Sequence, residues 1–272
     1  QEIALLFKFI YMYDIKDYHR YTTLMRNGFY DKLFFIDKIF GQWKTFLDFG
    51  CADGFLTKMI AEIFPDKQII GYDKSPEMIA RAIGSGSMPA NVTFTTSLPT
   101  SGIDIIYFCS VLHEITDEME REELEDHILD KLTPKYMIIR DMCFSFKNSI
   151  YTTGKEKLIT NISEYLSSIN KKGELERFEN IYGSIKTDRS FAQFLLKYSY
   201  IESPNWDREL NEDYFNSGSL IHRTSFRSGS RLTYIHDYNI PYLEQKWEDD
   251  FRFIAPSTFF TTHTQRIYKY EY

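Results

Sequence analysis

The chain has 272 residues, a formal net charge of -7 and three cysteines. This length is enough for one large α/β domain or two smaller domains, and the negative charge argues against non-specific wrapping of nucleic acid, which needs many cationic contacts to phosphates. The cysteines are far apart and form no C-x-x-C pair, which disfavours a disulfide framework and a zinc site and indicates a reducing, cytoplasmic location.

The first part of the chain alternates between helical and extended patterns. Phe29–Phe40 carries apolar residues on one helical face, and a buried strand is predicted at Thr45–Phe49. A glycine turn then opens a helix whose apolar periodicity stops at Pro65. A second short buried strand is predicted at Gln68–Tyr72.

A complete helix start signal follows the second strand. Ser75 is a hydroxyl N-cap, Pro76 suits the first helical position, and Glu77 places a carboxylate at the positive end of the helix dipole. Two more strands are predicted at Val92–Thr96 and Ile103–Cys109.

An acidic helix is predicted between Ile115 and Leu132, and a fifth strand at Tyr136–Arg140. Strands that alternate with helices form parallel βαβ units. Their ligands lie at the carboxyl ends of the strands.

The rest of the chain is less regular. Helical patterns occur at Leu158–Ile169 and Phe191–Tyr198. The last part of the chain is expected to form a strand at Arg231–Tyr238, a helix at Tyr242–Phe251 and a strand at Thr261–Tyr272. We therefore expect four segments: N-terminal helices over 1–44, an α/β core over 45–144, a helical insertion over 145–228, and C-terminal strands over 229–272 that complete the sheet.

The turn after the first strand has the chemistry of a nucleotide site. Gly50 lets the backbone turn sharply where we expect a side chain to collide with a ligand, and Gly54 allows a close approach at the helix start. A dinucleotide fingerprint requires glycines at positions 52 and 55, where this chain has Ala52 and Phe55. After the second strand, the Asp73 carboxylate can accept hydrogen bonds from two ribose hydroxyls.

These features together resemble the class I S-adenosylmethionine (SAM)-dependent methyltransferases. Their turn usually reads D/E-x-G-x-G-x-G, which Asp48, Gly50 and Gly54 match, with Ala52 in place of the middle glycine. The segment Ile103–Ile115 (IDIIYFCSVLHEI) is similar to the fourth-strand motif of small-molecule-type members. The resemblance covers about residues 40–145.

The resemblance implies SAM as cofactor, no metal, and a doubly wound, mostly parallel seven-stranded sheet with a helical insertion between the fifth and sixth strands. For the methionine end of SAM it implies that Asp48 orients the amino group, that the Gly50–Gly54 backbone with Cys51 and Ala52 runs beside the methionine moiety, and that Cys109 and Ser110 contact it. For the nucleoside end it implies that Asp73 holds the ribose and that Lys74 flanks the adenine. After the third strand the family often has an acid that reads the adenine amino group. This chain has Thr96-Ser97-Leu98, so Ser97 is assigned to that place.

Structural alternatives exist for several of these residues. Asp48 and Asp73 are also suited to capping roles, and buried cysteines such as Cys51 and Cys109 are usually packing residues. His113 is a candidate general base, with core packing or a backbone hydrogen bond as the alternative.

The remaining charges bear on the acceptor. The acidic run Glu114–Asp130 is typical of a solvated helix face that would repel a polyanion. A basic segment can either grip a phosphate or form a solvated strand edge: His222, Arg223, Arg227, Arg231 and His236.

No motif distinguishes O-, N- and C-methylation. The N/D-P-P-Y/F loop of amino-methylating DNA enzymes and the Pro-Cys nucleophile of cytosine-5 enzymes are both absent. The expected function is methyl transfer from SAM to a small-molecule or terminal acceptor. The alternatives are an RNA-directed (cap or tRNA) methyltransferase and a non-catalytic binding or assembly domain.

The 145–228 segment is expected to form a lid or substrate wall, with Trp206, Tyr214 or Phe215 covering the acceptor; a homodimer surface is the alternative. No membrane contact is expected, because no apolar run approaches the length of a membrane span and no signal-peptide pattern is visible.

Overall fold

The computed structural model describes a subset of the chain: residues 29–39, 42–115, 118–142, 160, 163–164, 166–168, 173–184, 194, 231–241 and 261–271. The chain divides into two compact units. One, here called the sheet unit, comprises Phe34–Ser145, Asn211–Ile240 and Thr261–Tyr272. The other, the second unit, comprises Gln1–Leu33, Phe146–Leu210 and Pro241–Phe260.

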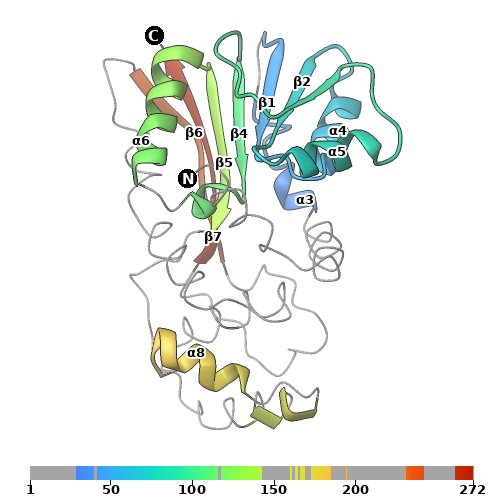
Figure 1. Ribbon diagram of the computed structural model, residues 1–272. Coiled ribbons are helices and arrows are strands. Elements are labelled where there is room, and N and C mark those ends of the chain that lie inside the picture. Colours follow the sequence, from blue (N-terminus) through green and yellow to red (C-terminus); the bar gives the residue numbers. More distant parts are fainter. Residues whose placement is uncertain are drawn as a thin grey trace. The chain divides into compact units, whose positions relative to one another are not determined.

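A seven-stranded sheet runs in the order β3-β2-β1-β4-β5-β7-β6 (Figure 1). Its strands are β1 Thr45–Phe49, β2 Gln68–Tyr72, β3 Val92–Thr95, β4 Ile105–Cys109, β5 Tyr136–Met142, β6 Arg231–Pro241 and β7 Thr261–Glu271. Strands β1 to β5 pair in parallel, and β7 pairs with β5 in antiparallel direction. This order confirms the predicted doubly wound, mostly parallel fold. The strand order reverses between β1 and β4, where such sheets bind ligands at their carboxyl ends.

The two faces of the sheet bury different side chains because successive strand residues point to opposite sides. On one face, Leu47, Phe108 and Ile139 belong to a core cluster that also contains Leu124 and Ile128. These two residues come from the helical segment between β4 and β5, so that segment covers this face. This part of the core is therefore built from β1, β4, β5 and β7 together with the helical segment that connects β4 to β5.

On the opposite face, Phe35 packs against Phe46 and Tyr107 at centroid distances of 5.5 and 5.2 Å. All three rings are buried. Farther along the sheet, Phe94 of β3 fills the space beside Gly54 and Gly71, where an added Cβ would overlap its ring. The glycines thus let β2 and the helix start come close to β3.

The helices of the sheet unit flank this sheet (Figure 1). They are α4 Phe55–Ile63, α5 Pro76–Gly84, the 3₁₀ turn η1 Leu112–Glu114, α6 Glu118–Asp126 and the π-helical segment η2 His127–Leu132. The predicted cap of α5 is confirmed, since the Ser75 side chain accepts a hydrogen bond from Met78 N. Strands β1 and β2 also have the predicted bounds.

Two helix predictions were wrong in extent. The helix expected at Phe29–Phe40 is present only at α3, Phe29–Lys32, and residues 33–38 form turns in which Lys38 N and Ile39 N both donate to Phe35 O. The burial of Phe35 on the sheet overrides the helical pattern. The acidic helix expected between Ile115 and Leu132 is divided in the described residues: α6 covers Glu118–Asp126, and a π-helical segment covers His127–Leu132.

The second unit contains α3 and α8, Glu174–Tyr182. In α8 the buried Phe178 stacks on Tyr182 at 4.5 Å and meets Phe194 edge-on at 5.3 Å. Most of the 145–228 segment, with Trp206, Tyr214 and Phe215, lies outside the described residues. Its role as a lid, a substrate wall or a dimer surface stays a prediction, as does the four-segment division of the chain.

Candidate functional site

The turn after β1 contains three left-handed residues, Gly50, Ala52 and Gly54, at φ values of 75°, 48° and 71°. Gly50 N and Cys51 N both donate to Tyr72 O, at 2.8 and 2.9 Å. The turn is therefore anchored on the carboxyl end of β2. It leads directly into α4, whose first residue follows Gly54.

Asp73, the first residue after β2, ties this turn to the next helix. Its Oδ2 accepts a hydrogen bond from Ala52 N at 3.0 Å, and its Oδ1 accepts one from Ser75 N at 2.9 Å. Burial raises the pKa of Asp73, while these two backbone hydrogen bonds and Lys74 oppose the rise. A carboxylate offers about four lone pairs, so two backbone N–H groups leave capacity for the hydroxyls of a ribose.

Asp48 is almost fully buried near the end of β1. Its Oδ2 accepts a hydrogen bond of 2.6 Å from the Thr57 hydroxyl of α4. This bond fixes the orientation of the carboxylate beside the turn. The contact leaves both sequence interpretations of Asp48, ligand and cap, as predictions.

The structure gives a reason of its own for glycine at position 50. A Cβ there would lie 2.5 Å from Cγ2 of Val111, so it would collide with the protein itself, and the expected collision with a ligand stays a prediction. The positive φ also favours glycine independently of any ligand. The close approach expected at Gly54 is an approach to Phe94 and Ala82, which pack around the start of α4.

Cys51 is buried in the turn, and burial is the main cause that raises the pKa of its thiol. The charges of Asp48 and Asp73 raise this pKa further. A thiol kept protonated is a poor nucleophile. These observations favour the packing interpretation of Cys51.

The carboxyl end of β4 forms the second part of the site. Cys109 ends the strand and Ser110 follows it with φ 54°. Ser110 N donates to Arg140 O at 2.7 Å, and Arg140 Nη1 donates to the Ser110 hydroxyl at 2.8 Å. Arg140 is buried at the end of β5.

His113 lies in the 3₁₀ turn η1 and is held by Asp141 of β5. The two side chains meet at 2.6 Å between Nδ1 and Oδ1, and Leu112 N donates to Oδ2 of Asp141 at 2.7 Å. Asp141 is fully buried. His113 is therefore oriented by a carboxylate, and its roles as a general base or as a packing residue both stay predictions.

Arg140 and Asp141 were not predicted as site residues from the sequence. The available signal was their position, since two adjacent charged residues follow the apolar run of a buried strand (YMIIRD) at the edge where ligands bind. They hold the segment after β4 from opposite faces of the sheet, because adjacent strand residues point to opposite sides.

Lys74 and Ser97 lie at the same edge of the sheet and are exposed. Lys74 Nζ pairs with Glu120 Oε1 of α6 at 3.3 Å. Ser97 N donates to Thr95 Oγ1 at 3.0 Å, which closes a tight turn after β3. The predicted cofactor residues therefore come together at the carboxyl ends of β1, β2 and β4, with Ser97 following β3.

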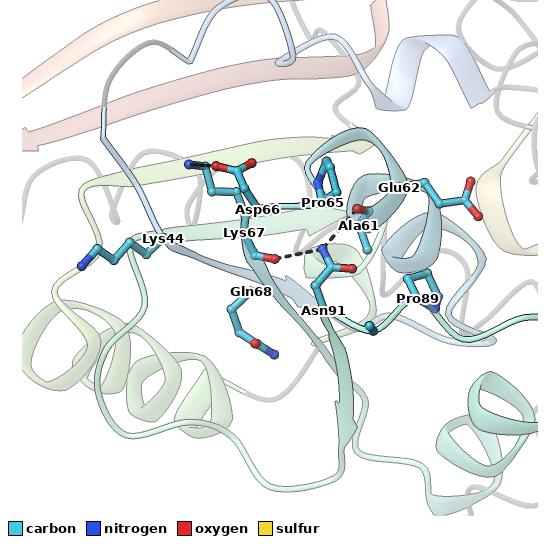
Figure 2. Close-up of a pocket in the computed structure, with 10 residues that line it drawn as sticks. Lys44, Ala61, Glu62, Pro65, Asp66, Lys67, Gln68, Pro89 and Asn91 are labelled. Atoms are coloured by element: carbon cyan, nitrogen blue, oxygen red, sulfur yellow. Dashed lines mark hydrogen bonds and ion pairs between the residues drawn. The ribbon is translucent and has the colours of Figure 1, made fainter.

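An open pocket of about 870 Å³ lies at the other edge of the sheet. Figure 2 shows it between Lys44, which precedes β1, and Pro89 and Asn91, which precede β3. The Asn91 amide donates to the carbonyl oxygens of Ala61, Phe64 and Lys67 around the end of α4. These bonds hold the wall of the pocket together. None of the predicted cofactor residues lines the pocket.

The described residues contain neither a metal-binding cluster nor a membrane-spanning helix. No group of three or more His, Cys, Asp or Glu side chains there is arranged to hold a metal ion. No described helix is long and apolar enough to cross a membrane.

Comparisons with known proteins agree with this geometry. Residues 47–135 match the family model described as "Methyltransferase domain". Trans-aconitate 2-methyltransferase of Streptomyces avermitilis is 28% identical over 117 residues, which are 40% of this chain and 44% of that protein. The chain thus spans less than half the length of this curated relative.

Two solved structures with a similar chain path are described as methyltransferases. The plantazolicin methyltransferase BpumL in complex with SAH, the demethylated form of SAM, has a TM-score of 0.46 and 13% identity, over 93% of this chain and 85% of that one. A TehB-like SAM-dependent methyltransferase from Corynebacterium glutamicum has a TM-score of 0.37 and 17% identity, over 46% and 72%. With scores this low, the fold assignment depends on the strand order itself.

The donor set at this edge fits SAM. The Asp73 carboxylate retains acceptor capacity at the end of β2, and the left-handed turn over residues 50–54 brings backbone groups to the end of β1. The strand order, this site and the match over residues 47–135 lead to one conclusion. Residues 47–135 match a methyltransferase domain, and the strand order and the donor set around it are those of a class I SAM-dependent methyltransferase site.

Proposed function

We propose that this chain transfers the methyl group of SAM to a small-molecule or terminal acceptor. The observation that carries the proposal is the position of Asp73, which joins the turn after β1 to the start of α5 through Ala52 N and Ser75 N. In this arrangement a single carboxylate orders both loops that border the nucleoside. Its remaining lone pairs accept the ribose hydroxyls.

The other cofactor residues take the roles that the family resemblance gives them. Asp48, oriented by Thr57, accepts the amino group of the methionine moiety. The 50–54 backbone and the Cys109–Ser110 backbone border that moiety, Lys74 flanks the adenine, and Ser97 meets its amino group.

When bound, SAM supplies a methyl group on a sulfonium, which needs little activation by the protein. The residues then have to position the acceptor and take its proton where it has one to lose. We assign proton removal to His113. Asp141 accepts a hydrogen bond from Nδ1–H and so selects the tautomer whose Nε2 accepts the proton.

A small acceptor is favoured by the charge near the site. Glu120 of α6 contacts Lys74, so an acidic helix flanks the nucleoside side of the site. Its exposed carboxylates oppose a polyanion: Glu120, Glu122, Glu123 and Asp126. The curated relative, moreover, is named for trans-aconitate, a small molecule.

The cofactor assignment is tested by titration calorimetry with SAH. We expect micromolar affinity, about -8 kcal/mol. The Asp73→Ala variant should bind about 10- to 100-fold more weakly, because a charged hydrogen-bond acceptor is lost. Asp66→Ala is the matched control, since Asp66 is an exposed carboxylate at the opposite edge of the sheet. Absence of SAH binding by the intact chain contradicts the proposal.

The acceptor is tested with SAM labelled in its methyl group. Transfer of label to fractionated metabolites supports a small-molecule acceptor, whereas transfer only to RNA identifies the RNA-directed alternative. SAH binding without transfer to either pool identifies a binding or assembly domain. The basic segment that would serve RNA lies outside the described residues, except for the backbone of Arg231 and for His236.

A further inference from the structure

We propose that Arg140 is a positioning residue for the cofactor: it holds Ser110 in the left-handed conformation that shapes the methionine end of the site. This inference rests on the proposed function, because it assumes that the Cys109–Ser110 backbone borders SAM. It concerns a residue for which the family resemblance gives no role.

Ser110 is held in a conformation that L-residues rarely adopt. Its φ is 54°, and the other non-glycine residues with positive φ in the described part of the chain are Ala52 and Thr133. Two of these three therefore lie in the loops assigned to the cofactor. The left-handed conformation costs about 1 to 2 kcal/mol for a residue with a Cβ, so neighbouring contacts have to stabilise it.

Arg140 supplies two such contacts. Its carbonyl oxygen accepts Ser110 N at 2.7 Å, and its Nη1 donates to the Ser110 hydroxyl at 2.8 Å. Arg140 is buried, with 7% of the residue exposed, so water weakens this partly buried hydrogen bond only a little. Serine at position 110 thus provides the hydroxyl that the guanidinium holds.

The sheet register explains why Arg140 reaches this serine. Cys109 of β4 pairs with Arg140 of β5 in parallel register, so their side chains lie on the same face. Ser110 is the next residue beyond β4 and enters the region at the carboxyl ends of the strands. Asp48 lies on that face too, since it pairs with Tyr107, two residues before Cys109.

The conformation of Ser110 also sets the place of Val111. Val111 Cγ2 occupies the space where a Cβ on Gly50 would stand, so the two cofactor turns are in contact at this point. If Ser110 relaxed to negative φ, the chain direction into Val111 would change. The effect of Arg140 is therefore expected to reach the turn after β1 through Val111.

The decisive comparison is between two substitutions of Ser110. Ser110→Ala and Ser110→Gly both remove the hydroxyl that Arg140 holds, but only glycine adopts positive φ without a Cβ penalty. We expect SAH to bind Ser110→Ala about fivefold to tenfold more weakly than Ser110→Gly. Equal affinities of the two variants overturn the inference, because the conformation of Ser110 would then be irrelevant to binding.

The role of Arg140 itself is tested by rescue. Arg140→Met should weaken SAH binding by about tenfold, and Arg140→Met combined with Ser110→Gly should recover most of that loss, because glycine no longer needs to be held. Arg81→Met is the control, since Arg81 is a partly exposed arginine whose side chain pairs with Glu77 on α5. It is expected to leave SAH affinity unchanged.

The outcomes separate this inference from the proposed function. No SAH binding by the intact chain contradicts the proposed function. If the intact chain binds SAH and the double variant is as weak as Arg140→Met, Arg140 acts only as a structural residue and the inference is wrong. If Arg140→Met does not fold, the Ser110→Ala and Ser110→Gly pair still tests whether SAH binding depends on the conformation of Ser110, because both variants keep Arg140 and lose the same hydrogen bond.

Discussion

Asp73 performs two tasks with one carboxylate. Its bonds to Ala52 N and Ser75 N order the loops at the end of β2, and its remaining lone pairs face the proposed ribose position. Burial raises its pKa above the ordinary value of 3.8. The same burial strengthens each hydrogen bond that the ionised form accepts.

A pH dependence follows from this raised pKa. Only the ionised carboxylate accepts both ribose hydroxyls, so SAH affinity should be constant above the pKa of Asp73 and fall as pH decreases through it. The sign for the stability of the free protein is opposite: the folded state holds this proton more tightly, so the contribution of Asp73 to stability decreases as pH rises through the same range. Calorimetry across pH measures the first effect.

Asp73→Asn provides the comparison. This variant cannot ionise, so it should bind SAH weakly at every pH and lack the acid-side decline caused by this group. A decline of the same size in Asp73→Asn would assign the pH dependence to another residue.

Asp141→Asn tests the proposed proton acceptor. The amide oxygen can still accept Leu112 N, but its NH₂ group faces Nδ1 of His113 and favours the wrong tautomer. For an acceptor that loses a proton, kcat should fall by roughly 100-fold or more while SAH affinity changes little. An unchanged kcat would give His113 a packing role. A lower SAH affinity without a change in kcat would limit Asp141 to ordering the turn after β4.

At the scale of elements, the contact between the turn after β1 and the segment after β4 is steric. Gly50→Ala should destabilise the fold by about 2 to 4 kcal/mol, because the new Cβ adds overpacking against Val111 to the cost of positive φ. Gly102→Ala is a matched control: Gly102 has the same φ of 75° and nothing within 4 Å of an added Cβ. It should lose only the backbone part, about 1 to 2 kcal/mol.

The steric part of this effect can be isolated. In a Val111→Ala background, Gly50→Ala should cost about as much as Gly102→Ala does alone, which denaturant unfolding would measure. If Gly50→Ala is no worse than Gly102→Ala in the original chain, the turn relaxes and the contact with Val111 has little energetic weight.

The elements that the sequence predicted well have local signals. The strands at Thr45–Phe49 and Gln68–Tyr72 are short apolar runs bounded by turn residues, and Ser75 and Pro76 mark the start of α5. The prediction of a helix over Phe29–Phe40 was wrong in extent because Phe35 packs against Tyr107 of β4, a strand far along the chain. The periodicity of the sequence carries no information about that contact.

The site shows the same division. Asp73 and the glycine turn are adjacent to predicted strands, so the sequence locates them. Arg140 lies beside Ser110 only because β5 pairs with β4. Gly50 comes close to Val111 only in the folded chain. Such contacts depend on register between strands, which one sequence without its structure does not specify.

At the scale of the molecule, every proposed cofactor residue lies in the sheet unit. Saturation with SAH at about 100 times its Kd should therefore stabilise this unit by about 2.7 kcal/mol. Hydrogen exchange should show the gain at the amides of Ala52 and Ser75, which donate to Asp73, and at Ser110 and Leu112.

The control for that experiment is the opposite edge of the sheet. Local protection by contact should be absent at the exposed loop residue Asp66, whose amide is expected to exchange without global unfolding. Equal protection there, and none at Ser110, would place SAH outside the proposed site.

The position of β7 has a consequence for how the protein is made. This strand lies between β5 and β6, and Tyr270 of β7 contacts Met137 of β5 across 133 positions of sequence. During synthesis, one edge of β5 therefore stays unpaired until residues 261–271 have left the ribosome. An apolar strand with unpaired backbone groups invites pairing with other chains. Ribosomes stalled before residue 261 should thus release chains that aggregate or recruit chaperones, although the whole proposed cofactor site has already been translated.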